Sequence, residues 1–146
     1  KLPANSSKVP KFSKLTKEKD VCLKQLDVVD RDFKEGFPGI PNLVEWFALD
    51  INWSVDIPED GTYKFYLNSD DGSYLSIDGG LVINNDGLHE QEEQSGKATL
   101  TKGQHKFRVT WYQGPRYRIA LELSWKRPGA SNREYIPTTF FHRPVK

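Results

Sequence analysis

The sequence contains a single cysteine, Cys22, no methionine and no uninterrupted apolar run of 18 residues. One cysteine cannot form a disulfide within the chain, and it excludes a metal site built from several cysteines. Because no apolar run is long enough to cross a bilayer as a helix, we expect no membrane insertion. The chain starts without methionine in a polar, lysine-rich stretch, which predicts that it is a segment of a larger multidomain protein.

Apolar residues make up only 36% of the chain, and no segment repeats them with the 3.6-residue period of an amphipathic helix. The sequence is instead rich in aromatic residues, with four Trp, six Tyr and eight Phe, and in the turn formers Gly and Pro. Aromatic side chains bury a large area and favour pleated sheets. This combination predicts short strands joined by turns.

Five segments alternate apolar and polar residues with a period of two, which is typical of strands with one buried face. They are residues 46–57, 63–67, 75–77, 107–111 and 119–125. Four Asp-Gly pairs suit tight turns with positive φ, and they are Asp60-Gly61, Asp71-Gly72, Asp78-Gly79 and Asp86-Gly87. The pattern predicts an all-β fold, an antiparallel β-sandwich or barrel of jelly-roll type with long loops.

The first 19 residues contain Pro3, Pro10 and six lysines, with little to bury. We expect them to form an extended lead-in or linker. Residues 20–146 are then a single β-sandwich domain, and a first strand is expected between Val21 and Phe33.

Charge is distributed unevenly. From Glu45 to Glu93 there are twelve acidic residues and only Lys64 to balance them, whereas the chain after residue 96 is basic. An acidic block suits a cation or a hydroxyl-rich ligand better than nucleic acid, which needs clustered basic and aromatic residues. We expect no nucleic-acid partner, and a solvated outer strand face is the alternative explanation of the block.

Patterns of catalytic and metal-binding residues are missing. No Asp-Gly pair has the acidic spacing of an EF-hand loop, and the three histidines, His89, His105 and His142, are isolated. Neither a Ser-His-Asp nor a Cys-His context is present, and no carboxylate pair is placed as in a glycosidase. The sequence therefore predicts a non-enzymatic domain.

The step Asp70-Asp71-Gly72 is chemically the most unusual feature. Adjacent side chains on a strand point to opposite faces, so the two carboxylates converge only if the backbone between them is unusual or a cation neutralises them. Gly72 allows a backbone conformation that other residues adopt only at a cost. A polar hairpin turn is the alternative interpretation of the same residues.

The run GTYKFYLNSDDGSYLSIDG, residues 61–79, resembles the core of the protective-antigen-type β-sandwich, the PA14 domain family. The resemblance continues through residues 81–89, through the strand at residues 107–111 with Tyr112-Gln113-Gly114 after it, and through residues 121–125. Upstream, residues 36–39 and 45–48 resemble bacterial members. The similarity covers about residues 20–140.

The resemblance implies a function. In the calcium-dependent sugar-binding members, an Asp-Asp pair joined by a cis peptide directs both carboxylates at one calcium ion, and this pair matches Asp70 and Asp71. A second loop of the family supplies an amide side chain and backbone carbonyls, which matches Gln113 and the carbonyls from Gly114 to Arg118. Calcium accepts six to eight oxygen ligands, so sugar hydroxyls can complete its coordination. The resemblance thus implies a lectin-like, calcium-dependent carbohydrate-binding module of a secreted, cell-surface or periplasmic bacterial protein, such as an adhesin.

The sequence departs from the family at this second loop, where Pro115-Arg116-Tyr117-Arg118 replaces a small, glycine-rich segment. Tyr117 could stack on a sugar ring and Arg116 could reach an acidic group of the ligand. Alternatively, an arginine could lie on Asp70 or Asp71 in place of a cation. The domain would then be a non-catalytic structural or protein-interaction module without a small-molecule ligand.

Overall fold

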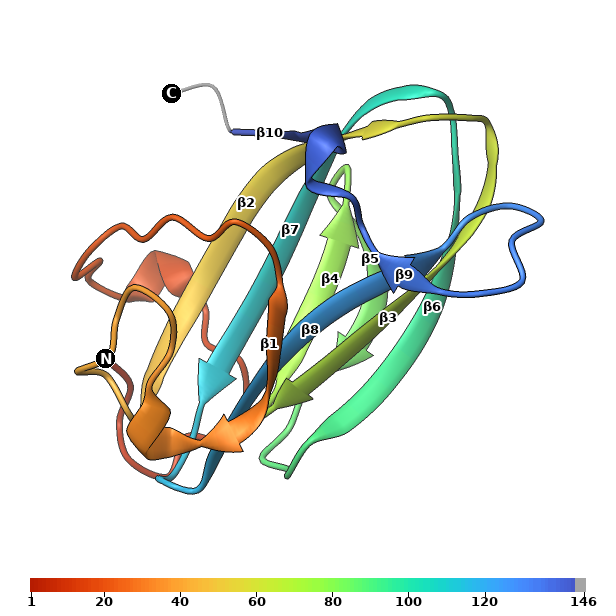
Figure 1. The fold of residues 1–146 in the computed structure, drawn as a ribbon. Helices are drawn as coiled ribbons and strands as arrows, with labels where there is room; N and C mark the ends of the chain where they lie inside the picture. The colour runs from red at the N-terminus through yellow and green to blue at the C-terminus, as the bar shows by residue number, and fades with distance from the viewer. Residues whose placement is uncertain (144–146) are drawn as a thin grey trace.

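A computed structural model describes residues 1–143, which form a sandwich of two antiparallel β-sheets (Figure 1). The strands are β1 (Asp27–Asp32), β2 (Phe47–Ile57), β3 (Gly61–Asp70), β4 (Ser73–Ile77), β5 (Gly80–Asn85), β6 (Glu92–Leu100), β7 (Gly103–Gln113), β8 (Arg118–Lys126), β9 (Glu134–Tyr135) and β10 (Phe141–His142). Short 3-10 turns lie at Phe12–Lys14, Phe33–Glu35 and Thr138–Phe140. The predicted all-β sandwich is confirmed.

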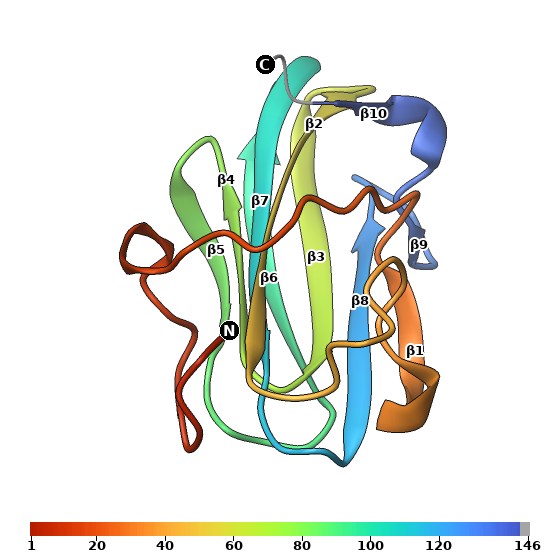
Figure 2. The ribbon, with the colours of Figure 1, turned by 90° about the vertical axis from the view of Figure 1, so that its left-hand side faces the viewer.

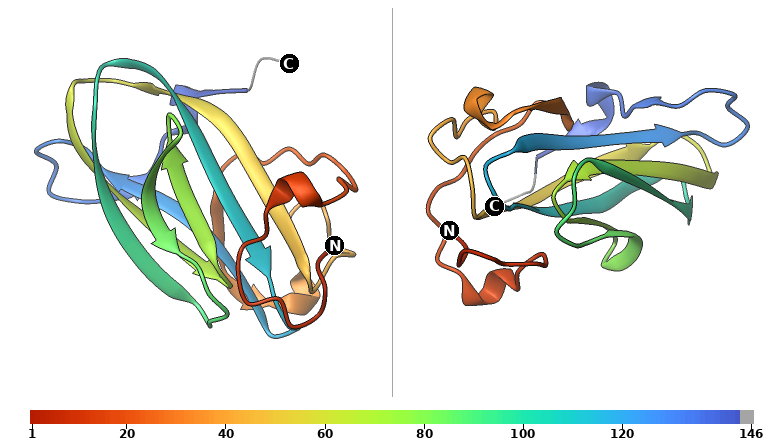
Figure 3. Two further views of the ribbon diagram at one scale, coloured as in Figure 1. Left: turned by 180° about the vertical axis from the view of Figure 1, so that it is seen from behind. Right: turned by 90° about the horizontal axis from the view of Figure 1, so that it is seen from below.

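Sheet 1 has the order β1-β8-β3-β6, and β9 pairs with β8 beyond the end of β1. Sheet 2 has the order β10-β2-β7-β4-β5. Seen from below, the two sheets lie as separate layers (Figure 3, right). The short connection from β3 to β4 passes from sheet 1 to sheet 2, so the residues between these two strands lie at one end of the sandwich.

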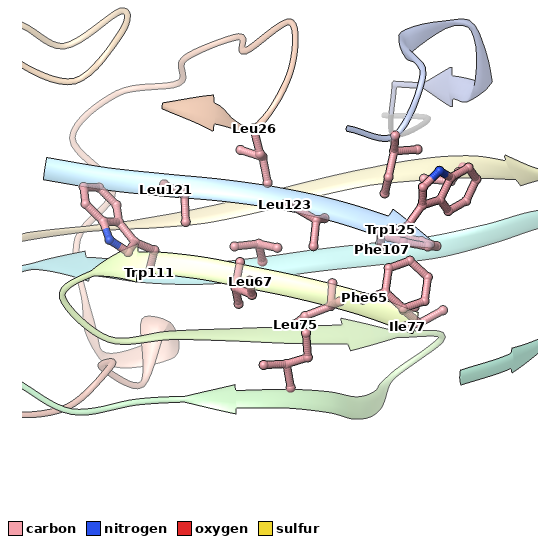
Figure 4. Close-up of a cluster of buried hydrophobic side chains, with 14 of the residues drawn as sticks. Leu26, Phe65, Leu67, Leu75, Ile77, Phe107, Trp111, Leu121, Leu123 and Trp125 are labelled. Carbon is pink, nitrogen blue, oxygen red and sulfur yellow. The ribbon is translucent and has the colours of Figure 1, made fainter. Parts of the chain in front are cut away.

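The core lies between the sheets and is built from the residues that the period-two patterns placed on one face. Phe65 and Leu67 of β3, Val109 of β7, and Leu121 of β8 are fully buried. Figure 4 shows these strands contributing side chains to one apolar layer, with Trp111 and Trp125 at its two ends. Aromatic contacts run through this layer, and each fully buried large side chain contributes about 1.5–3 kcal/mol by leaving water.

The first strand begins later than the sequence predicts. β1 starts at Asp27, and the apolar residues Val21 and Leu23 pack against the core from an irregular segment. A bulge in β1 places Val29 and Asp30 opposite the single residue Ala120 of β8. Val29 is consequently 56% exposed, although an apolar side chain in a strand would be expected to face the core.

The N-terminal segment packs against the sandwich (Figure 2). Leu2 is buried and donates its N–H to Trp46 O at 2.6 Å, and Val9 donates its N–H to Asp86 Oδ1 at 2.7 Å. Its role as a lead-in or linker to another domain stays a prediction. Within residues 1–143, no helix combines the length and the apolar character needed to span a membrane.

Candidate functional site

Asp70 and Asp71 lie where the chain leaves sheet 1 for sheet 2, and the peptide bond between them is cis. Asp70 ends β3 opposite Ala120 of β8. Its carbonyl accepts a hydrogen bond from Trp111 Nε1 at 3.0 Å, and Asp71 N–H donates to Tyr112 O at 3.3 Å. Strand β7 of sheet 2 therefore fixes the backbone of both residues.

The two carboxyl groups are buried, with 6% of Asp70 and 4% of Asp71 exposed, and the charge of Asp71 acts directly on Asp70. Their other partners differ. Asp71 accepts hydrogen bonds from the backbone N–H of Gly114 at 2.7 Å and of His89 at 3.2 Å. No backbone or side-chain N–H within residues 1–143 donates to the Asp70 carboxyl, so Asp70 is the member of the pair with unused acceptors.

Burial, together with the negative charges of Asp71 and Asp30, raises the pKa of Asp70 to about 7. Burial also raises the pKa of Asp71, against the N–H groups of Gly114 and His89, which favour its charged form. Two neighbouring carboxylates repel each other in a poorly solvated environment. The pair therefore favours either a shared proton or a bound cation.

Two glycines allow the approach of the loops to this pair. A Cβ on Gly114 would lie 2.8 Å from Asp71 Oδ2, and a Cβ on Gly72 would lie 2.6 Å from Asp86 Oδ1 and 2.8 Å from Tyr112 Cε1. Gly61, Gly79 and Gly87 adopt positive φ as the Asp-Gly pairs predict, but Gly72 is absent from the positive-φ glycines. The requirement for glycine at position 72 is therefore space and not backbone conformation.

Gln113 is fully buried at the end of β7. Its Nε2 donates to Pro115 O at 3.1 Å and to Arg118 O at 2.9 Å, which orients the amide. Its Oε1 is buried and has no hydrogen-bond partner within residues 1–143. Because buried polar atoms are normally satisfied, this oxygen is available to accept a hydrogen bond or to coordinate a cation.

The loop carbonyls are largely occupied. Gly114 O accepts from Trp46 N–H, Pro115 O from Tyr117 N–H, and Tyr117 O from Phe33 N–H. Arg116 O receives no hydrogen bond from any residue that the structure describes. Of the carbonyls expected as ligands, that of Arg116 is thus the freest.

The arginines of this loop have partners away from the Asp pair. Arg116 Nη2 lies 2.8 Å from Glu45 Oε1, and Arg118 Nε lies 2.6 Å from Asp30 Oδ2. Tyr117 is 74% exposed and its ring contributes nothing to the core. The structure therefore joins Asp70, Asp71 and Gln113 in one end of the sandwich and leaves Arg116 and Tyr117 at its rim.

Three contributors to the site had no clear signal in the sequence. His89 acts through its backbone N–H and not through its ring, which is held by Asn85 O and Glu90 O. Asp86 anchors Val9 and Tyr74 beside Gly72. Asp30 reaches the site only because of the bulge in β1, which alternation cannot reveal.

The donor set fits a hard cation. Within residues 1–143, no group of three or more His, Cys, Asp or Glu side chains is placed to hold a metal, so an ion at the Asp pair would need ligands of other kinds. Two carboxylates, an unpartnered amide oxygen and a free carbonyl are all oxygen donors, the type that calcium prefers.

Several solved structures have a fold similar to that of this chain. An anti-sigma factor domain-containing protein is 24% identical over 82% of this chain, with a TM-score of 0.71. A PA14 sugar-binding domain from an RTX adhesin is 18% identical over 82% of this chain and 76% of its own length, with a TM-score of 0.63. The subtype-switched epithelial adhesin 9 domain from Candida glabrata, in complex with β-lactose, is 13% identical over 75% of this chain and 63% of its own, with a TM-score of 0.53. These similarities show a shared fold.

The chain spans 42% of the length of the anti-sigma factor protein. No curated protein matches it. The family model described as PA14 domain matches residues 44–138, a narrower range than the similarity noted from the motifs. The chain belongs to the PA14 domain family.

Proposed function

We propose that this domain is a calcium-dependent carbohydrate-binding module of a larger secreted or cell-surface protein. The single observation that carries the proposal is the convergence of the buried Asp70 and Asp71 carboxyls where the Asp70 carboxyl has no N–H donor within residues 1–143. A buried charge without a partner is costly, and a divalent cation removes that cost.

Asp70, Asp71 and Gln113 Oε1 would hold the calcium ion, with the Arg116 carbonyl as the backbone ligand that fits best. When bound, the ion supplies open coordination positions that vicinal sugar hydroxyls can fill. The protein's own contribution is orientation. Gly114 and His89 N–H groups fix the Asp71 carboxylate, and the Gln113 amide is fixed by its two bonds to loop carbonyls.

The loop beyond Gln113 supplies the ligand contacts. Tyr117 presents an exposed ring, a surface on which sugar rings stack. Arg116 is held by Glu45 but is 59% exposed at its side chain, so its remaining N–H groups are free to donate to hydroxyls. Neither arginine replaces the cation, since each is paired with an acid other than Asp70 and Asp71.

The similar structures support the sugar as ligand class. One is described as a sugar-binding domain of an adhesin, and another contains β-lactose. A binding role within a larger, surface-exposed protein agrees with these descriptions and with the absence of catalytic motifs from the sequence. We therefore place the domain outside the cytoplasm and assign it no catalytic reaction.

Thermal unfolding with millimolar calcium or with a chelator tests the proposal, followed by glycan-array binding under the same two conditions. We expect calcium to raise the Tm of the wild-type domain and to be required for glycan binding. Asp71→Asn should remove both effects. Asp20→Asn is the matched control, because the side chain of Asp20 is 83% exposed and contacts only Lys17. An unchanged Tm in calcium would refute the mechanism.

A further inference from the structure

A polar pocket lies on the outer face of sheet 1, and neither Asp70 nor Asp71 lines it. It has a volume of about 220 Å³ and is lined by six residues from β3, β6, β8, β9 and the segment before β9. These residues are Asn68, Glu93, Glu122, Ser124, Arg133 and Tyr135. None of them contributes to the calcium-dependent function proposed above.

The strand register connects this pocket to the Asp pair. Asn68 pairs with Glu122 and Asp70 pairs with Ala120, so these four residues occupy consecutive rows of the same sheet face. Residues two apart on a strand point to the same side and are separated by about 7 Å. Asn68 therefore begins the pocket one row beyond Asp70, and Ala120 occupies the row between Asp70 and Asp30 with a small, fully buried side chain.

Hydrogen bonds hold the pocket's polar groups in place. Glu122 accepts Asn68 Nδ2 at 2.8 Å through Oε2, and it accepts Tyr135 OH at 2.5 Å through Oε1. Each carboxylate oxygen has a further lone pair for an incoming donor. Asn68 is 7% exposed and so is itself more than nine-tenths buried, which fixes the position of Glu122.

The opposite wall of the pocket provides donors and an aromatic surface. Arg133 donates Nη1 to Glu93 Oε1 at 2.7 Å, and its guanidinium lies 4.6 Å from the centre of the Tyr66 ring. Only one of its five N–H groups is used in that bond, which leaves the others free to donate. Tyr135 is 39% exposed, and its phenol is held by Glu122.

We propose that this pocket is a second subsite, and that the domain binds a neutral oligosaccharide whose terminal sugar occupies the calcium site and whose next units lie along the outer face of sheet 1. The proposal rests on the proposed function for the terminal sugar. Fixed carboxylate, amide and guanidinium groups beside an exposed aromatic ring suit hydroxyl groups on an apolar ring face. Two carboxylates against one guanidinium make an anionic glycan unfavourable.

Calorimetric titration with oligosaccharide series tests this inference. Malto-, cello- and manno-oligosaccharides of one to six units serve as probes, each measured in calcium and in chelator. For the series that binds, we expect affinity to rise by about tenfold between one unit and three, because the added unit gains hydrogen bonds in the pocket. Tyr135→Ala and Arg133→Ala should each remove most of that gain and leave monosaccharide affinity unchanged.

Lys97→Ala is the matched control, since Lys97 is exposed on the same face, four residues from Glu93 in β6. Amide chemical shifts of the labelled protein provide a second readout, with changes expected at Asn68, Glu122 and Tyr135 for the trisaccharide but not the monosaccharide. Calcium-dependent binding without any gain in affinity with chain length would overturn the second subsite alone. Chelator-insensitive binding that Tyr135→Ala still weakens would overturn only the calcium function. Absence of binding for every series would overturn both.

Discussion

The two ends of the sandwich both carry aspartates in turns, but they treat the carboxylates in opposite ways. At one end, Asp78 accepts hydrogen bonds from His105 Nδ1 at 2.6 Å and from Lys106 N–H at 2.8 Å. At the other end, no N–H group within residues 1–143 donates to Asp70, which instead faces Asp71. The first arrangement satisfies the hydrogen-bonding groups of a turn, whereas the second leaves a carboxyl that a proton or a bound cation must neutralise.

The pKa values follow this difference. Burial acts to raise the pKa of Asp78, but the hydrogen bonds from His105 and Lys106 outweigh it and lower the value below that of a free carboxyl. Burial raises the pKa of Asp70 to about 7 because no such donors are present. Hydrogen bonds to Asp78 therefore favour its charged form in the folded state, whereas the folded state favours the protonated form of Asp70.

The largest expected effect is the loss of calcium response in Asp71→Ala. A hundredfold excess of calcium over its Kd stabilises a binding protein by about 2.7 kcal/mol. For a domain of this size that corresponds to a Tm rise of roughly 10 °C, which the variant should lose entirely. Differential scanning calorimetry measures it, and Asp78→Ala should lower the Tm while keeping the full calcium response. A calcium response that survives in Asp71→Ala would erase the contrast between the two ends.

The next largest effect is a loss of calcium affinity that we expect from a substitution at Gly114 but not from one at Gly79. In Gly114→Ala, the new Cβ would lie 2.8 Å from Asp71 Oδ2, so the carboxylate must move. We expect calcium affinity to fall by about 10- to 100-fold, as is typical when a group that orients a metal ligand is disturbed. In Gly79→Ala nothing lies within 4 Å of the new Cβ, and only its positive φ is unfavourable. That variant should lose about 1 kcal/mol of stability with unchanged calcium affinity by titration. Equal calcium affinities in the two variants would contradict the role of Gly114.

The pH dependence of stability should have opposite signs at the two ends. The folded-state pKa of Asp70 is above the unfolded value, so the folded protein binds more protons and its stability without calcium falls as pH rises from about 4 to 7. The pKa of Asp78 is lowered, so its contribution is present above about pH 4 and is lost as pH falls through its folded pKa.

Urea unfolding at several pH values measures both contributions. Asp70→Asn should flatten the decline between pH 4 and 7, and Asp78→Asn should reduce the loss below pH 4. The raised pKa values of His89 and His105 add a decline of the same sign above pH 6.5, so the difference between wild type and each variant isolates the aspartates. A decline that Asp70→Asn leaves intact would count against the unsatisfied carboxyl.

The smallest expected effect is that of Tyr117→Ala. Its ring is exposed and distant from the core, so stability and calcium affinity should remain unchanged. Affinity for the bound glycan should fall by about threefold, the loss expected for one stacking contact. Titration with the bound oligosaccharide in calcium measures it, and a change in calcium affinity would mean that the loop has a structural role.

Alternation and turn chemistry predict most of the fold. The pattern of residues 46–57 corresponds to β2, and the pattern of residues 119–125 lies within β8. The alternation is visible in the sequence because inward-facing residues such as Leu121 and Trp125 are buried in one core. The start of β1 and its bulge were missed, since a bulge depends on pairing with β8 and not on local sequence.

The candidate site is predictable only in part. The motifs identify Asp70, Asp71 and Gln113, and the structure brings them to one end of the sandwich; metal binding by them stays a prediction. The partners of Arg116 and Arg118, and the backbone N–H of His89, depend on long-range packing that no local pattern encodes. The pocket at Asn68 and Glu122 likewise exists only through the register of β3, β8 and β9.

The central claim is that the Asp70–Asp71 pair binds calcium, and calorimetric titration of calcium into the wild-type domain and into Asp70→Asn at pH 7.5 tests it most directly. We predict saturable binding of one calcium ion per wild-type chain and none in the variant. No heat of binding in the wild type, or equal binding in the variant, would contradict the claim.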